Sequence, residues 1–288
     1  MAAVKRSIKT VGLVAKRERP EAITIARTLT SFLRTQHKTP LADPETAKKI
    51  GAEPIERHRL AERADLIVVL GGDGTLLGVA RLVAAQGIPI LGVNLGGLGF
   101  LTEVTIKEAR AALGRVLAGD YEVDRRIMLE AIVERASEQL AQSFQAFNDV
   151  VVGKGPLGRM LELDVIANHE AFCSYRADGL IIATPTGSTA YALSAGGPIV
   201  YPTLGAIVLA PICPHTLSNR PVVLPDTYEI EICVKAPDHD TTITVDGQES
   251  AQLGPADTIK IHRGRHAVSL IRSAHPYFEI WRDKLHWG

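Results

Sequence analysis

The stretch Leu66–Thr75, LIVVLGGDGT, decides the fold of this chain. Its first half is an apolar run rich in β-branched residues, which is typical of a strand buried in a parallel sheet. The glycines that follow, Gly71, Gly72 and Gly74, mark the carboxyl end of that strand, where open α/β sheets bind ligands. Because glycine lets the backbone turn sharply and present N–H groups, the stretch predicts a loop that can hold a phosphate.

Asp73 places a carboxylate beside this loop. A carboxylate next to a phosphate is unfavourable unless it holds Mg²⁺ or removes a proton from an attacking hydroxyl, and both are steps of phosphoryl transfer. The alternative interpretation is a tight turn, because Asp-Gly is a strong turn dipeptide. The loop is not the lysine-containing P-loop, since no Gly-Lys-Ser/Thr sequence follows it.

The composition is that of a folded protein with no dominant charge. The chain has 288 residues, 46% of them hydrophobic and 22% charged, and this length favours two domains. Lys plus Arg and Asp plus Glu both number 32, so overall charge does not drive binding to nucleic acid or to an anionic membrane. A local site must therefore carry the function.

The sequence contains no clear targeting segment and no cysteine pattern typical of a zinc site or a set of disulfides. The apolar run Val11–Ala15 is too short for a signal peptide core or a membrane span, so we expect a cytoplasmic protein. Cys173, Cys213 and Cys233 lack the paired spacing of a zinc site, and their odd number argues against a disulfide framework. We interpret them as structural thiols.

Hydrophobic periodicity around the first loop indicates alternating strands and helices. A strand at Thr10–Ala15 precedes a helix whose apolar face runs through 22–33, and a helix at about Leu76–Gln86 leads to a strand at Ile88–Val93. This order is a βαβ arrangement with a right-handed crossover. Residues 39–56, with scattered prolines and charges, predict a loop region or a weak helix around Glu45–Ile50.

A second glycine-rich turn follows the strand at Ile88–Val93. It contains Asn94 and three glycines within 96–99, and it leads into Phe100-Leu101-Thr102. Because the carboxyl ends of parallel strands share one edge of a sheet, we expect both turns to face one crevice. A further amphipathic helix is predicted between Ile106 and Leu117.

The apolar period changes after residue 119. Alternating residues at 161–165, 230–234, 243–245 and 259–261, separated by turn signals, predict antiparallel strands. The carboxyl half is therefore predicted to be a separate, mostly β domain that begins near 119–126.

Residues 179–219 contain no Asp, Glu, Lys or Arg. Their prolines exclude a membrane-spanning helix, so we expect this stretch to be buried. It holds the small polar run Thr184–Tyr191, which favours burial against a ligand or a partner subunit. The alternative is a Ser/Thr-rich turn between strands.

Together these motifs resemble the bacterial NAD kinases, a family related to the diacylglycerol and sphingosine kinases. The resemblance covers nearly the whole chain, and its most specific part is the Pro-Thr-Gly-Ser-Thr-Ala-Tyr segment. The residues that carry it are Gly71–Thr75, Asn94 to Leu101, Asn148-Asp149, Arg176 with Asp178-Gly179, Thr184–Tyr191, Ser194–Pro198 and Asp246–Gln248.

The resemblance implies an α/β amino-terminal domain with a Rossmann-like parallel sheet, and a β-rich, β-sandwich-like carboxyl-terminal domain. The first would comprise residues 1–125, with 272–288, including Trp281 and Trp287, packing back onto it. The second, residues 126–271, would bind NAD and form a homodimer or homotetramer, and the uncharged stretch fits such an interface.

The implied reaction is transfer of the γ-phosphoryl group of ATP to the 2′-hydroxyl of the adenosine ribose of NAD, which gives NADP. Gly71, Gly72, Gly74 and Thr75 would contact the phosphates of ATP. By similarity Asp73 is the general base, although a role in orienting the metal stays open. Mg²⁺ is expected on the triphosphate, and no side chain is assigned as a metal ligand.

The resemblance also implies an NAD site. Asn148 and Asp149 would hold adenine and ribose, with an Asx turn as the alternative interpretation. Arg159 and Arg176 would contact phosphates, unless they are solvated strand-face residues. The full implied set is Gly74, Phe100 beside the adenine, Asn148, Asp149, Arg159, Arg176, Asp178 toward the nicotinamide, Thr186, Thr189, Ala190, Tyr191, Ala192, Leu193, Ser194 and Gln248.

Two rival functions share part of this pattern. A lipid kinase of the diacylglycerol or sphingosine type has the glycine loop but does not require Thr184–Tyr191. A non-catalytic dinucleotide sensor would keep the NAD pocket but has no need for Asp73.

His215 and His275 are interpreted as loop or interface residues. The use of polyphosphate, the acceptance of NADH and feedback by NADP are left open by the sequence.

Overall fold

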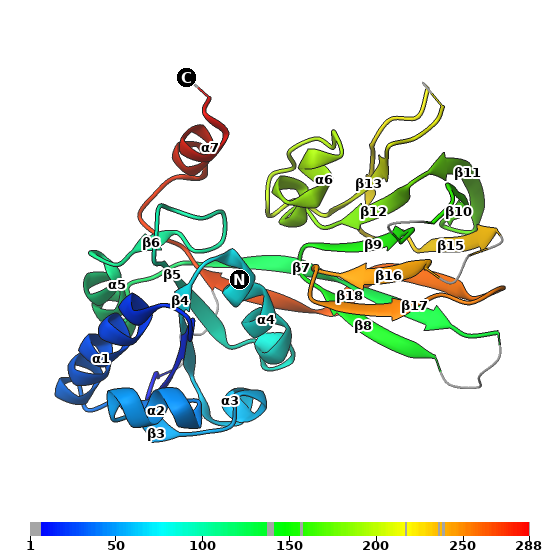
Figure 1. Ribbon diagram of the computed structural model, residues 1–288. Helices are drawn as coiled ribbons and strands as arrows, with labels where there is room; N and C mark the ends of the chain where they lie inside the picture. Colours follow the sequence, from blue (N-terminus) through cyan, green and yellow to red (C-terminus); the bar gives the residue numbers. More distant parts are fainter. Residues whose placement is uncertain are drawn as a thin grey trace. The chain divides into compact units, whose positions relative to one another are not determined.

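The computed structural model describes residues 7–136, 141–155, 158–216, 218–235, 237 and 240–287, and it consists of two compact units (Figure 1). Unit 1 comprises Met1–Arg125 and Val268–Gly288, and unit 2 comprises Arg126–Ala267. The long strands β7 (Val123–Glu134) and β18 (Thr258–Ile271) each contribute residues to both units.

Unit 1 is built on a parallel sheet with the strand order β5-β4-β1-β2-β3. Short stretches of β6 and of the end of β18 also pair with β5 in parallel. This confirms the predicted βαβ arrangement. The strands are β1 (Thr10–Ala15), β2 (Thr39–Ala42), β3 (Glu53–Pro54), β4 (Leu66–Gly71), β5 (Pro89–Asn94) and β6 (Val104–Thr105).

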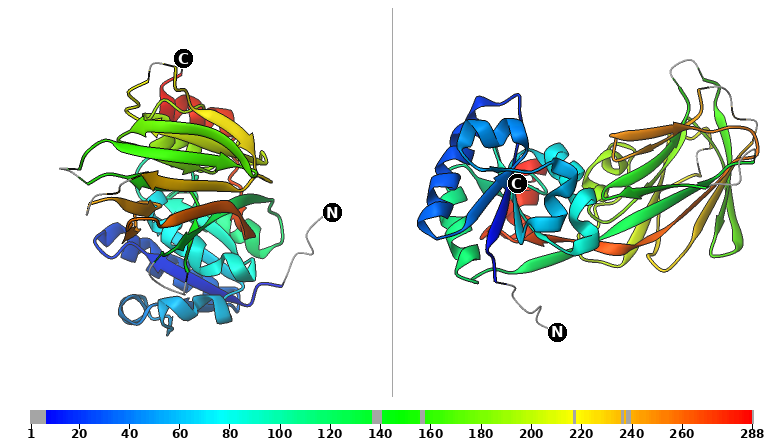
Figure 2. Two further views of the ribbon diagram at one scale, coloured as in Figure 1. Left: turned by 90° about the vertical axis from the view of Figure 1, so that its right-hand side faces the viewer. Right: turned by 90° about the horizontal axis from the view of Figure 1, so that it is seen from below.

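Helices cover both faces of this sheet (Figures 1 and 2). Alternate residues such as Leu13 and Val68 share one core cluster with the apolar sides of α1 and α5. Gly12 faces the other way, toward Leu60 of α3 and Ile67. The helices of unit 1 are α1 (Pro20–Thr35), α2 (Pro44–Ile50), α3 (Leu60–Arg63), α4 (Asp73–Val83), α5 (Ala109–Leu117) and α7 (Tyr277–Leu285), with short 3-10 turns at Arg57–Arg59 and Ala84–Gln86.

Two sequence-based expectations for unit 1 are confirmed only in part. The weak helix expected around Glu45–Ile50 is present as α2, but the residues on either side of it form the strands β2 and β3 rather than a loop. Strands of four and two residues are too short for an alternating pattern to show; β2 forms by pairing with β1, and β3 forms by pairing with β2. The helix expected from Leu76 begins at Asp73, inside the glycine motif.

Unit 2 contains two antiparallel sheets. One is six-stranded, in the order β14-β13-β12-β9-β16-β17. The other contains β11-β10-β15-β18 together with the β7–β8 pair. The strands are β8 (Gln142–Ala146), β9 (Asp149–Gly153), β10 (Leu161–Ala167), β11 (Glu170–Ala177), β12 (Gly179–Ala183), β13 (Ala206–Ile212), β14 (Val222–Pro225), β15 (Ile230–Lys235), β16 (Thr242–Val245) and β17 (Glu249–Gln252).

The core of unit 2 lies between these sheets. The alternating residues of β10 and β15, such as Leu163 and Ile232, are fully buried together with Leu180 and Val152 of the six-stranded sheet. Each such side chain contributes roughly 1.5–3 kcal/mol to the stability of the folded state. The predicted β-sandwich is therefore confirmed.

A smaller cluster covers the outer face of the six-stranded sheet. Ile181 and Val208 point outward there and pack with Ala192 of the short helix α6 (Tyr191–Ser194) and with Val200. Figure 1 shows α6 beside β12 and β13. The segment between these strands thus forms a third layer that positions the Thr184–Tyr191 run.

Burial of the uncharged stretch is confirmed for its strands but not for all of its connecting residues. β12 is wholly buried, whereas Tyr191 and Leu204 are 46% and 54% exposed.

No helix within the described ranges has both the length and the apolar character needed to cross a membrane. The three cysteines are unpaired thiols, and Cys213 is exposed.

Candidate active site

The glycine motif forms the junction between β4 and α4. A methyl group on Gly71 would meet the Thr75 hydroxyl oxygen at 2.6 Å, so glycine is needed here for packing. Gly72 has an extended backbone, whereas Gly74 lies in the first turn of α4. At both glycines, no described atom beyond the neighbouring residues of the chain lies within 4 Å of the place where a Cβ would be. The structure thus leaves open space at the amino end of α4, where N–H groups favour an anion.

Asp73 fixes the second glycine turn. Its Oδ2 accepts the Phe100 N–H at 3.0 Å. Its Oδ1 accepts the N–H groups of Leu101 at 3.2 Å and Thr102 at 3.0 Å, and the Thr102 hydroxyl at 2.9 Å. The sequence predicted that both turns lie at the same sheet edge, and the structure shows that the Asp73 carboxylate joins them directly.

Other contacts shape the second turn. The Asn94 side chain accepts the Gly96 N–H at 2.8 Å and donates to the Thr102 hydroxyl at 2.7 Å. A Cβ on Gly99 would clash with Asp73, Thr102 and Asn94, and one on Gly92 would lie 2.9 Å from the Leu101 carbonyl oxygen. The turn therefore packs against β5 and α4 at close range, which glycine alone permits.

Within unit 2, the Asp246 carboxylate organises the Asn148-Asp149 turn. Its oxygens accept the N–H groups of Phe147 at 3.0 Å, Asn148 at 2.7 Å and Asp149 at 3.2 Å. The Asp246 N–H in turn donates to the Asp149 carbonyl oxygen at 2.9 Å. Asn148 and Asp149 thus occupy a backbone conformation that another carboxylate holds in place.

The Thr184–Tyr191 run packs onto the same turn. The Thr184 N–H donates to the Asn148 carbonyl oxygen at 2.8 Å, and the Thr184 hydroxyl donates to the Phe147 carbonyl oxygen at 2.7 Å. The Gly187 N–H donates to the Thr184 hydroxyl at 3.0 Å, and a Cβ on Gly187 would overlap the Asn148 backbone. The two motifs that the sequence assigned to NAD therefore meet in the structure.

A cavity of about 390 Å³ opens between these segments of unit 2. Its volume is in the range of small-molecule sites. The residues that line it are Asn148, Asp149, Val151, Ala190, Tyr191, Thr244, Asp246 and Gly247. Four of the predicted NAD residues, Asn148, Asp149, Ala190 and Tyr191, are among them.

Burial perturbs one carboxyl group in this cavity. The pKa of Asp149 rises from 3.8 to about 7, first because the side chain is removed from water and second because the Asp246 carboxylate is close. Asp149 and Asp246 are only 5% and 8% exposed. A group that titrates near neutral pH in a cavity is a candidate functional residue.

This pKa shift predicts how stability depends on pH. Between about pH 4 and pH 7 the folded chain keeps a proton on Asp149 that the unfolded chain releases, so this group lowers stability as the pH rises. Asp149→Asn removes the penalty and should stabilise the protein at pH 8 relative to pH 5, by on the order of a few kcal/mol. Urea unfolding at both pH values measures the difference. Asp283→Asn, which removes an exposed carboxylate, is the control for the loss of one negative charge.

The other predicted NAD residues near the Thr184–Tyr191 run are Thr186 and Thr189 within it, and Ala192, Leu193 and Ser194 directly after it. Thr186 is buried and its hydroxyl lies 3.4 Å from the Arg126 guanidinium, while the Thr189 hydroxyl donates to the Thr186 carbonyl oxygen at 3.2 Å. Ala192 is fully buried in the outer-face cluster, Leu193 is partly buried and Ser194 is exposed. The residues from Ala192 onward do not line the cavity.

Five other predicted NAD residues also lie outside the cavity lining. Arg176 is 61% exposed and pairs with Glu162 at 3.3 Å, and Arg159 is exposed. Asp178 pairs with Lys154 at 2.7 Å, and the Gln248 side chain is exposed. Phe100 belongs to unit 1, where its backbone contacts Asp73.

Metal-binding groups are sparse in the described ranges. No set of three or more His, Cys, Asp or Glu side chains there gathers closely enough to hold an ion. Mg²⁺ in nucleotide sites usually binds through one or two carboxylates together with phosphate oxygens. The described residues thus fit a metal that is carried by a nucleotide better than one held in an all-protein cage.

Comparison with known proteins agrees with this geometry. The profile of the ATP-NAD kinase N-terminal domain matches residues 11–121, and that of the ATP-NAD kinase C-terminal domain matches residues 147–273. The chain belongs to the NAD kinase family. The lipid kinase alternative is thereby set aside.

Relatives and solved structures support the assignment to the NAD kinases. The chain is 44% identical to the NAD kinase of Geotalea daltonii over 283 residues, which covers 98% of this chain and 99% of the relative. It resembles the yeast NADH kinase complexed with NADH, with a TM-score of 0.91 and 27% identity over 98% of this chain and 88% of that one. An NAD kinase from Archaeoglobus fulgidus in complex with ATP shares the fold, with a TM-score of 0.78 and 23% identity over 97% of this chain and 100% of that one.

Sequence reasoning missed two side chains of this NAD kinase that shape the candidate site. Asp246 was named only within the Asp246–Gln248 motif, without a role of its own, because a turn Asp and an Asp that holds a distant backbone have the same local signature. Thr102 was named only as the residue that follows the second turn. Its hydroxyl bonds to Asp73 and Asn94, and only the tertiary structure brings these together.

Proposed function

We propose how this chain carries out the reaction of its family, the phosphorylation of NAD to NADP with ATP. Asp73 is the base for the 2′-hydroxyl of the adenosine ribose, and the cavity with Asn148 and Asp149 holds the adenosine part of NAD. The observation that carries the proposal is the position of Asp73 at the start of α4, next to the open space at Gly72 and Gly74.

The hydrogen bonds of Asp73 favour one of its oxygens as the proton acceptor. Oδ1 already accepts three hydrogen bonds, from the Leu101 amide and from the amide and hydroxyl of Thr102. Oδ2 accepts only the Phe100 amide and keeps a lone pair for a further donor. A positioned base of this kind typically accelerates proton transfer by about 10² to 10⁴-fold.

The glycine motif supplies the phosphate contacts in this proposal. The open space at Gly72 and Gly74 admits a phosphate close to the backbone, and the amino end of α4 stabilises its charge. Mg²⁺, when bound with ATP, neutralises charge on the phosphates. The chain itself orients the donor through backbone N–H groups rather than through a P-loop lysine.

Unit 2 supplies the acceptor contacts. Asn148 offers an amide, and Asp149 offers a carboxyl group that titrates near neutral pH and can bond to a ribose hydroxyl. Tyr191 gives an aromatic wall to the same cavity. This combination of an amide, a carboxyl group and an aromatic ring suits an adenosine.

We also propose a homodimer or homotetramer in the cytoplasm. The support is the uncharged stretch of unit 2, in which Tyr201 and Leu204 are 36% and 54% exposed. Exposed apolar side chains that gather in one segment are typical of a subunit contact. Light scattering on the purified protein measures the mass, and a monomer at all concentrations would contradict this proposal.

Two neighbouring glycines give a prediction that separates packing from ligand contact. Gly71→Ala places a methyl group against Thr75 and should lower the melting temperature. Gly72→Ala meets no described atom and should leave the melting temperature unchanged, yet raise the KM for ATP because the methyl group occupies the phosphate space. Thermal unfolding and steady-state kinetics with varied ATP measure both effects. An unchanged KM in Gly72→Ala would remove that glycine from the donor site.

The central experiment is a direct assay. Purified protein is incubated with NAD, ATP and Mg²⁺, and the product is detected with an NADP-specific dehydrogenase. NADP should form with ATP and Mg²⁺ and fail to form after chelation by EDTA. Parallel reactions with inorganic polyphosphate, with NADH and with diacylglycerol micelles define the donor and acceptor range. Absence of NADP in all of them would refute the proposal.

A further inference from the structure

Lys284 lies beside the second glycine turn. It is in the last turn of α7, is partly buried, and its Nζ is 3.9 Å from the place where a Cβ on Gly97 would be. Among the described residues no Asp or Glu is within ion-pair distance of this ammonium group. A cation in the last turn complements the helix dipole, but the dipole does not require the ammonium to lie at Gly97.

The turn next to Lys284 has amides available to a ligand. Its flanks are fixed, since Asn94 accepts the Gly96 N–H and Asp73 accepts the amides of residues 100–102. By contrast, the amides of Gly97 and Leu98 donate to no acceptor in the described part of the chain, and Gly97 is exposed. An ammonium group beside two free amides in a glycine-rich turn is an arrangement that suits a phosphate.

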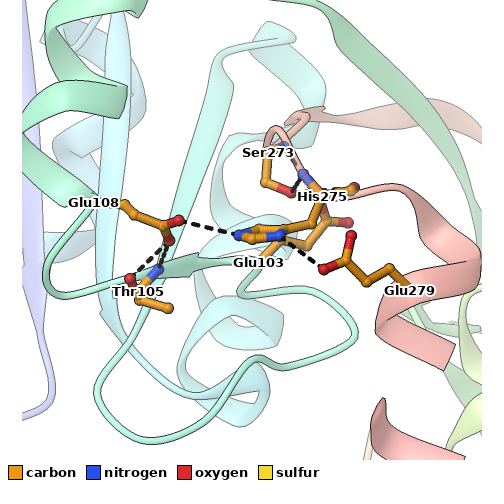
Figure 3. A network of polar contacts seen from close by, with 6 residues as sticks. All are labelled: Glu103, Thr105, Glu108, Ser273, His275 and Glu279. Atoms are coloured by element: carbon orange, nitrogen blue, oxygen red, sulfur yellow. Dashed lines mark hydrogen bonds and ion pairs between the residues drawn. The ribbon is translucent and has the colours of Figure 1, made fainter. Parts of the chain in front are cut away.

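The helix that carries Lys284 is anchored to the same segment as the turn (Figure 3). The His275 ring lies between two carboxylates, with Nε2 3.2 Å from Glu108 and Nδ1 3.7 Å from Glu279. Glu108 also accepts the Thr105 hydroxyl at 2.7 Å and the Thr105 amide at 3.0 Å. These bonds, with a smaller effect of His275, lower the pKa of Glu108, so its carboxylate stays ionised at neutral pH.

A second anchor precedes the helix. Ser273 donates to Glu103 through its hydroxyl at 2.9 Å and its amide at 3.2 Å. Glu103 directly follows Thr102, which Asp73 holds. The turn and the entry to α7 are therefore both attached to the short segment 102–108. This arrangement fixes the place of Lys284 relative to the turn and, through the turn, relative to Asp73.

From this arrangement we infer that Lys284, with the amides of Gly97 and Leu98, binds a phosphate of the donor triphosphate. The inference rests on the proposed function and adds a cation to it. The glycine motif contains no lysine or arginine, so it supplies no positive side chain. The donor triphosphate, by contrast, carries several negative charges that must be stabilised during phosphoryl transfer. Lys284 supplies one from a helix about 200 residues further along the chain.

The test changes the charge beside the second glycine turn in two independent ways. Lys284→Gln removes the ammonium group, and Gly97→Asp sets a carboxylate beside an intact Lys284. Gly97→Asn is the neutral control of equal size, and only Lys284 lies within 4 Å of a Cβ at this position among the described residues. Lys284→Arg keeps the charge. The measurements are the KM for ATP, the KM for NAD, and the rise in melting temperature caused by inorganic triphosphate alone.

Lys284→Gln and Gly97→Asp should each raise the KM for ATP about tenfold, with little change in the KM for NAD, and lose the thermal shift given by triphosphate. Lys284→Arg should retain both properties, and Gly97→Asp should lose more of the triphosphate shift than Gly97→Asn, because these two side chains have equal size and differ only in charge. Equal triphosphate shifts in the wild type and in Lys284→Gln would overturn the inference. This readout needs no turnover, so it separates the inference from the proposed function, which is tested by NADP formation in the wild type.

Discussion

Replacing Asp73 with Asn should reduce kcat by about 10² to 10⁴-fold, which is the loss expected when a general base is removed. The amide oxygen of Asn is too weak a base to accept the proton of a ribose hydroxyl. The KM for NAD should change little, because the adenosine contacts proposed above lie in unit 2. Single-turnover measurement of NADP formation with saturating ATP and NAD gives the effect on chemistry alone.

The Asp73 variant also loses structural contacts, and a control is needed to separate the two effects. Asp73 accepts the amides of Phe100, Leu101 and Thr102, so Asp73→Asn should lower the melting temperature as well. Asp65 is a matched residue, since it accepts the amides of Lys9 and Thr10 at 2.8 Å each. Asp65→Asn should lower the melting temperature but keep kcat. Equal losses of kcat in both variants would show that Asp73 has only a structural role.

Gly187→Ala should nearly abolish NAD binding. A Cβ at this position would overlap the Asn148 carbonyl group, so either the Thr184–Tyr191 run or the Asn148-Asp149 turn must move. Such overpacking typically costs about 1–3 kcal/mol of stability. Movement of about 1 Å in a binding site can also cost roughly 10²-fold in activity. Equilibrium binding of NAD and thermal unfolding measure the two consequences.

The control for Gly187→Ala lies in the same unit. Gly153 ends β9, the strand that begins at Asp149, and a Cβ there would make only an ordinary contact of 3.9 Å with Val151. Gly153→Ala should therefore leave both NAD binding and melting temperature close to those of the wild type. If Gly187→Ala behaved like Gly153→Ala, the contact between Gly187 and Asn148 would not shape the NAD site.

Much of the fold could be predicted from local patterns. The run Leu66–Leu70 is apolar because both faces of its strand are covered by helices, and the alternation at Leu161, Leu163 and Val165 reflects a sheet with one buried face. The edge strands β2 and β3 could not be predicted in this way. Their four and two residues carry too little pattern, and pairing with longer neighbours forms them.

Some residues of the candidate site could likewise be named from the sequence, and others could not. Asp73 could be named from the sequence because the glycines around it mark backbone that must turn or approach a ligand closely, whereas Asn148 and Asp149 were named through the resemblance to the NAD kinases. Asp246 could not be assigned its role, since it acts on amides about 100 residues away in the chain. The same holds for Lys284, whose neighbour is Gly97.

The sequence by itself determined the parallel sheet with its glycine motif, the β-rich carboxyl half and the membership of the NAD kinases. These depend on periodicity and on short motifs, which are local properties of the chain. Only the tertiary structure decided that the Asp73 carboxylate ties two glycine turns together, that burial and the nearby Asp246 carboxylate raise the pKa of Asp149, and that Lys284 faces Gly97. The physical reason is that hydrogen bonds and charges act through distance in space, and folding sets that distance between residues that are remote in sequence.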